Sequence, residues 1–147
     1  MISVSVQEAA FDVAAELNRL NMAGVGAQVS FTGIVRDTEG DLKALELEHY
    51  PAMTKAAIEV FCVEAKRRWD LAGVVVIHRY GKLAVGETIM MVAVASAHRR
   101  AAFEAADFLM DYLKSRAPFW KKEHRADGAT WVEAKQSDEA DLQRWDH

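Results

Sequence analysis

The sequence predicts an α+β fold, in which helices pack on a mostly antiparallel sheet and a β-hairpin lies near the C-terminus. Segments with apolar residues at helical spacing alternate with short β-branched segments. The turn sequence Ala126-Asp127-Gly128 separates the last two short segments, as in a hairpin. The GVG at 24–26 lacks a third glycine and precedes a predicted strand, which excludes a Rossmann fold.

The chain length limits the number of domains. With 147 residues, 51% of them hydrophobic, the chain can bury one sizeable core but not two ordinary ones. No repeat or linker-like segment divides it, so residues 1–147 are expected to form one domain. The polar tail from about 136 to 147 is expected to be mobile or to serve at an interface, with Trp145 as an anchor.

The first half is predicted to contain two helices and two strands. Residues 6–22 have the apolar spacing of a helix, at Ala10, Val13, Ala14, Leu17 and Leu20. Segments 27–36 and 43–50 are predicted strands, and we expect them to pair as a hairpin. Pro51 suits the first turn of a helix that runs to about Asp70, because no N–H is needed there.

The second half begins with two apolar, β-branched strands at 73–81 and 87–96, and the second is long enough to be central. A third helix should begin around Ala97, with Ser96 as its N-cap. It should stop before Pro118, because proline disfavours helical geometry in the preceding residue. The predicted hairpin follows, from strands 119–124 and 129–134.

Two features indicate a cytoplasmic protein. The apolar runs are well short of the roughly 18 residues that span a bilayer. The N-terminus lacks a basic segment followed by an apolar one, the pattern of an export signal. Cys62, the single cysteine, shares a helical stripe with Ile58 and Ala65, which favours a buried structural thiol over a nucleophile.

Positive charge concentrates in residues 114–125. The formal net charge of the whole chain is −4, which argues against general nucleic-acid binding. Residues 114–125 nevertheless contain five lysines and arginines against one glutamate. A local cationic site on an acidic chain indicates a small or local anionic partner.

His98 and Arg99 are candidates for an anion site at the start of the third helix. Free backbone N–H groups and guanidinium donors favour phosphate or carboxylate there. A solvated first turn is the alternative, and for Arg100 we prefer an i,i+4 bond to Glu104.

Lys114 and Lys121 are candidates for catalysis. A predicted helix end and Pro118 separate them, so a chain reversal would aim both amines at one point, where one becomes a competent base or nucleophile. A solvated charged face is the alternative. Arg36 is a further candidate at a strand end, next to Gly33, which indicates a bulge or a close backbone approach.

No metal or other cofactor is predicted. His49 and His78 lie within predicted strands and have no suitably spaced ligand partners, so both are expected to be ordinary sheet residues.

Several motifs together resemble the family of molybdopterin synthase catalytic (large) subunits. The resemblance covers about Gly26 to Lys135 and rests on FTGIVRD, LELEHYPAMTKAAI, VIHRYGKLAVGE, SAHRRAAFEAADFLMDYLKSRAPFWKKE and WVEA. It implies an α/β-hammerhead-like fold and a sulfurtransferase of molybdenum cofactor biosynthesis. Such an enzyme inserts two sulfurs into cyclic pyranopterin monophosphate (precursor Z) to give molybdopterin.

The resemblance also implies partners. The sulfur donor is the thiocarboxylated Gly-Gly terminus of a small ubiquitin-like carrier subunit. Two large subunits form a central homodimer, with one carrier at each outer end of a heterotetramer.

The family's site residues match positions in this sequence. Lys114 and Lys121 match the catalytic lysines, with Lys121 also contacting substrate, and Arg36, His98 and Arg99 match residues that bind the substrate's anionic groups. His98 and Arg99 reach into the neighbour's site. Lys135 stands where the family pattern leads us to expect an arginine, and no role is assigned to it.

Other functions are compatible with the residues alone. A non-catalytic module that binds an anion or a partner's C-terminal carboxylate predicts binding without turnover. Phe119 and Trp120 would serve as stacking platforms in a weak RNA binder, which the net charge disfavours. An enzyme acting on another phosphorylated heterocycle is the third alternative.

Overall fold

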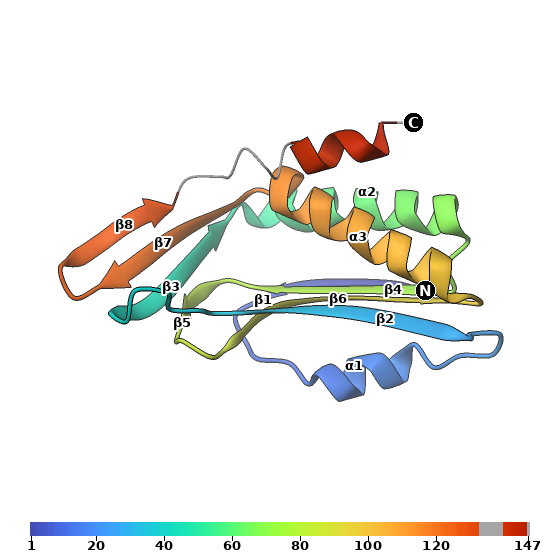
Figure 1. Cartoon of the computed structure of the whole chain (residues 1–147), viewed down its shortest axis with the longest axis horizontal. Coiled ribbons are helices and arrows are strands. Elements are labelled where there is room, and N and C mark those ends of the chain that lie inside the picture. Colours follow the sequence, from blue (N-terminus) through green and yellow to red (C-terminus); the bar gives the residue numbers. More distant parts are fainter. Residues whose placement is uncertain (133–139, 147) are drawn as a thin grey trace.

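The computed structural model describes residues 1–132 and 140–146, whose strands form two four-stranded sheets (Figure 1). The first has the order β1-β4-β6-β2, from β1 (Ile2–Gln7), β2 (Ala27–Ile34), β4 (Gly73–Arg79) and β6 (Thr88–Ser96). The second has the order β5-β3-β7-β8, from β3 (Leu42–His49), β5 (Gly81–Leu83), β7 (Phe119–Arg125) and β8 (Gly128–Val132). In this described part β1 pairs with β4 in parallel and the other neighbours are antiparallel, which confirms the predicted class.

Helices cover both faces of the first sheet. Figure 1 shows α2 (Pro51–Trp69) and α3 (Arg99–Arg116) on one face and α1 (Val13–Arg19) on the other. Because both faces are covered, every residue of β4 is buried. Val74 and Val76 belong to the core that includes α2 and α3 residues, whereas Val75 and Ile77 belong to the core on the α1 side.

The predicted helix at 6–22 is wrong in its first half. β1 occupies residues 2–7 and pairs with β4, and its alternate apolar residues pack on the core. Alternation along ISVSVQ is a strand pattern, and pairing with a buried strand overrides the weak helical spacing that follows. The helix begins only at Val13, after Asp12, whose side chain accepts a hydrogen bond from the Ala15 N–H at 3.1 Å.

The predicted hairpin of 27–36 with 43–50 is also wrong. β2 pairs with β6 in the first sheet, and β3 pairs with β5 and β7 in the second. The loop between β2 and β3 therefore passes from one sheet to the other. The register of β2 shifts between Gly33 and Ile34, which confirms the predicted bulge.

Several other predictions about elements are confirmed. α2 begins at Pro51, β6 lies inside its sheet, and β7 and β8 form the C-terminal hairpin.

The prediction that Ser96 is the N-cap of the third helix is wrong. α3 begins at Arg99 with His98 as its N-cap, and the Ser96 hydroxyl donates a hydrogen bond to the His98 carbonyl instead. The chain between β6 and α3 passes so close to residue 26 that only glycine fits there, because a Cβ on Gly26 would lie 2.3 Å from the Ala97 carbonyl oxygen.

Cys62 and Trp145 are both packed on the core. The Cys62 side chain is fully buried, and burial raises the pKa of its thiol to about 12, as expected for a structural cysteine. The Trp145 ring contacts the Phe108 ring edge-on at 5.5 Å, and its Nε1–H donates to Asp111 at 2.6 Å. Trp145 therefore anchors residues 140–146, whereas residues 133–139, which include Lys135 and the start of the predicted tail, lie outside the described residues.

No helix among the described residues is long and apolar enough to cross a membrane.

Candidate active site

One end of the first sheet gathers three of the candidate residues. β2 and β6 run antiparallel, with Ile34 opposite Thr88, so Arg36 lies just beyond the end where β6 begins. α3 starts beyond the other end of β6 and runs back, which brings Lys114 to the same end as Arg36. Figure 1 shows the C-terminal end of α3 leading directly into β7, the strand that carries Lys121.

All three of these side chains are exposed. They come from three different elements: a loop for Arg36, the last turn of α3 for Lys114 and β7 for Lys121. Lys121 lies opposite Leu47 of β3 and shares a strand face with Phe119. The predicted chain reversal at Pro118 is thus the turn from α3 into β7.

A wall of aromatic rings adjoins Lys121. The Phe119 ring stacks on His78 with 3.7 Å between centroids, and the His49 ring lies 4.4 Å from that of Tyr80 and 6.0 Å from that of Phe119. His78 is buried, and its Nδ1 lies 2.9 Å from the Arg79 carbonyl oxygen. The wall therefore places buried aromatic surface beside the exposed Lys121 side chain.

Both histidines are held neutral. Burial lowers the pKa of His78 to about 4, and the nearby charge of Lys121 acts in the same direction. Burial also lowers the pKa of His49, whose Nδ1 is buried with no hydrogen-bond partner among the described residues. The sequence predicts both histidines to be ordinary sheet residues and does not reveal their proximity to Phe119. Their position could have indicated it, because His49 ends β3 and His78 lies next to the end of β4, where side chains of different strands come together.

His98 and Arg99 lie far from the lysines. An α-helix rises about 1.5 Å per residue, so the fifteen steps from Arg99 to Lys114 separate them by roughly 22 Å along the axis of α3. Together with Gly26 and Phe103 they line a cleft of about 740 Å³ at the other end of the sheet. A single chain therefore does not bring His98 and Arg99 to Lys114 and Lys121.

Arg100 is paired as predicted. Its Nη1 lies 3.8 Å from Glu104 Oε1, one turn along α3, and its side chain is 88% exposed. Arg99, one residue earlier, lines the same cleft as Arg100.

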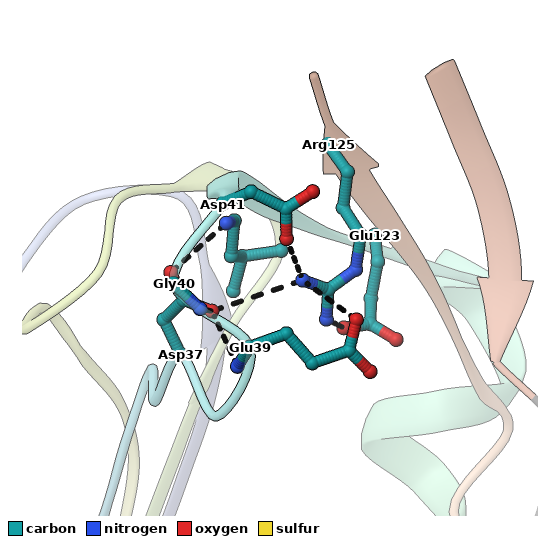
Figure 2. Close-up of polar contacts among 7 residues, drawn as sticks. Asp37, Glu39, Gly40, Asp41, Glu123 and Arg125 are labelled. Atoms are coloured by element: carbon teal, nitrogen blue, oxygen red, sulfur yellow. Dashed lines mark hydrogen bonds and ion pairs between the residues drawn. The ribbon is translucent and has the colours of Figure 1, made fainter. Parts of the chain in front are cut away.

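A cluster of carboxylates around Arg125 fixes the loop after Arg36 (Figure 2). Asp37 accepts hydrogen bonds from the N–H groups of Glu39, Gly40 and Leu42, at 3.1, 2.9 and 2.9 Å. Burial raises the pKa of Asp37, but these backbone donors outweigh it and hold that pKa below its ordinary value. Asp37 is therefore ionised and turns the chain directly after Arg36.

The comparisons with known proteins agree on one family. The family model described as "MoaE protein" matches residues 6–116. Curated relatives named molybdopterin synthase catalytic subunit include one from Mesorhizobium japonicum, 59% identical over 97% of this chain and 92% of its own length. One from Cereibacter sphaeroides is 58% identical over 97% and 99%. The solved structure of a MoaE protein from Burkholderia ambifaria matches with a TM-score of 0.85 and 45% identity, over 99% of this chain and 98% of that one.

Proposed function

Because the chain belongs to the MoaE protein family, we propose that it transfers two sulfurs to cyclic pyranopterin monophosphate from the thiocarboxylated terminus of a small carrier subunit. The enzyme class is that of the catalytic subunit of molybdopterin synthase. The observation that supports the chemistry most is the gathering of Arg36, Lys114 and Lys121 from three elements at one end of the sheet.

Lys114 has the properties that the sulfur donor requires. The thiocarboxylate sulfur bonds to a side-chain carbon of the pterin and displaces an oxygen substituent from it. Water then attacks the acyl carbon and the acyl carbon–sulfur bond breaks, which leaves the sulfur on the pterin and a carboxylate on the carrier. Attack on this carbonyl places negative charge on its oxygen, which a nearby ammonium group stabilises. Lys114, exposed at the end of α3, holds the carrier's terminus and supplies that charge.

Lys121 moves protons at the pterin side chain. It stands beside the aromatic wall and is close enough for its charge to lower the pKa of His78. Two neutral histidines in this wall add no competing positive charge. Lys121 therefore serves as the assisting acid or base and as a substrate contact.

The substrate's phosphate binds to Arg36 together with His98 and Arg99 of a second copy. The roughly 22 Å between Arg99 and Lys114 along α3 supports this division, because one chain does not bring both to a small substrate. The assembly is then a homodimer with a carrier at each outer end. The closed twofold symmetry typical of homodimers completes two equivalent sites.

We also place the enzyme in the cytoplasm. Cys62 is a free thiol, as is usual in a reducing compartment. Cell fractionation tests this part of the proposal, and recovery of the native protein outside the cytoplasmic fraction would contradict it.

Product formation with two forms of the carrier tests the reaction. Purified chain is mixed with cyclic pyranopterin monophosphate and a Gly-Gly carrier that ends in either a thiocarboxylate or an ordinary carboxylate. Dithiolene product should form with the thiocarboxylate alone. Tight binding of both carriers without product would instead support the non-catalytic interaction module.

A further inference from the structure

Arg125 joins the loop after β2 to the strand that carries Lys121. Its Nη1 lies 2.6 Å from Asp41 Oδ1, 3.6 Å from Glu39 Oε2 and 3.7 Å from Asp37 Oδ1. Its Nη2 lies 2.5 Å from Glu123 Oε2, two residues away on β7. Figure 2 shows the guanidinium between the loop and the strand, with carboxylates on both sides.

The centre of the cluster is shielded more than its edge. The side chains of Arg125 and Asp37 are 16% and 15% exposed, so their attraction is less screened than that of a surface pair, whereas Asp41 and Glu39 are 43% and 70% exposed. The hydrogen bond to Asp41, together with the charges of Glu123 and Glu39, raises the pKa of Arg125 above its ordinary value. Arg125 is thus a permanent cation among four carboxylates.

Two of the proposed site residues lie next to this cluster. Arg36 directly precedes Asp37, whose side chain fixes the turn through three backbone N–H groups. Lys121 lies on the same face of β7 as Glu123 and Arg125, because residues two apart point the same way. The loop carboxylates bind Arg125, which leaves the exposed Arg36 to face solvent.

We propose that Arg125 is a positioning residue for anion binding, which holds the 37–41 loop against β7 and so fixes Arg36 at the end of the sheet where Lys121 lies. The inference rests on the proposed function. Without Arg125 the four carboxylates would repel one another. The loop would then leave β7, and Arg36 would lose its place relative to Lys121.

Kinetics separate a positioning role from a general structural one. Arg125→Gln should raise the KM for cyclic pyranopterin monophosphate about tenfold and leave kcat within about twofold. Arg125→Lys keeps the charge but loses the planar fork, so its KM should be intermediate. The matched control is Arg67→Gln, which removes an exposed arginine with two hydrogen bonds to Glu64 on α2 and should leave KM unchanged.

A double-mutant cycle tests whether Arg125 acts through Arg36. In an Arg36→Ala background, Arg125→Gln should raise KM by no more than about twofold, because the residue it positions is gone. A further tenfold rise in that background would overturn the proposal. If Arg125→Gln does not fold, Asp41→Asn removes the 2.6 Å partner alone and should give a smaller rise in KM that is also lost without Arg36.

Hydrogen exchange gives a readout that does not depend on turnover. The backbone N–H groups of Glu39, Gly40 and Leu42 should exchange at least tenfold faster in Arg125→Gln than in the wild type. Equal exchange would overturn the inference whatever the activity. If exchange is faster in Arg125→Gln but the wild type makes no product, the proposed function is refuted. The contact by which Arg125 holds the 37–41 loop against β7 is then still supported.

Discussion

The rings of Phe119 and His78 stack face to face, with 3.7 Å between their centroids and 19° between their planes. Phe119 begins β7 in the second sheet, and His78 lies near the end of β4 in the first. The contact therefore fastens one sheet to the other at the point where Lys121 emerges. The contact also buries the His78 imidazole, so the stability of the folded chain should depend on pH.

His78 should make the free energy of unfolding depend on pH. Burial lowers its pKa from 6.5 to about 4, so the unfolded chain takes up a proton in this range and the folded chain does not. The stability that neutral His78 contributes is complete above pH 6.5 and is lost as pH falls toward 4. The loss is about 3 kcal/mol at 1.36 kcal/mol per pKa unit.

Urea unfolding of the wild type and of His78→Gln between pH 4 and 7 measures this dependence. The difference in unfolding free energy between the two proteins should shrink by about 3 kcal/mol as pH falls from 7 to 4. A constant difference over this range would show that His78 is not a buried neutral imidazole.

Arg99 and Arg100 should respond differently to replacement by lysine. Arg99→Lys should raise the KM for the pterin substrate more than it lowers kcat, because lysine cannot bind a phosphate through a planar fork. Arg100→Lys is the matched control, since Arg100 is 88% exposed and forms an ion pair with Glu104. Equal effects of the two substitutions on KM would remove Arg99 from the binding set.

Inactive variants should complement each other if two copies share each site. Arg99→Ala and Lys114→Ala proteins, mixed in equal amounts and allowed to exchange subunits, should recover about a quarter of wild-type activity. In random pairing half of the dimers are mixed, and each of those has one intact site. Activity that stays at the mean of the two separate variants would place the complete site within one chain.

Much of the fold could be predicted from local patterns. Proline placement, β-branched runs and the Ala-Asp-Gly turn located α2, β4, β6 and the last hairpin. The errors came from pairings distant in sequence. β1 exists because β4, about seventy residues later, offers it a buried edge. The partners of β2 and β3 are likewise strands beyond α2, which a local hairpin signal does not reveal.

The candidate site was predictable to a similar extent. Charge and helix position indicated Lys114, Lys121, His98 and Arg99, and the family resemblance joined them into one site. The predicted helix from about Ala97 to Pro118 already placed His98 and Arg99 at the opposite end from Lys114. The sequence did not indicate that His78 stacks on Phe119. Arg125 was counted only as part of a basic segment, because its four acidic neighbours come from two separate parts of the chain.

Sulfur transfer should depend on both Lys114 and Lys121. Single-turnover dithiolene formation with thiocarboxylated carrier measures this dependence in Lys114→Ala, Lys121→Ala and Lys122→Ala. Lys122 is the matched control, because it follows Lys121 but points to the other face of β7, where its amine lies 5.1 Å from the Trp131 ring centre. Loss of at least a hundredfold in rate for the first two variants, with near wild-type rate for the third, is the predicted result. Near wild-type turnover by Lys114→Ala and Lys121→Ala would show that sulfur transfer needs neither lysine.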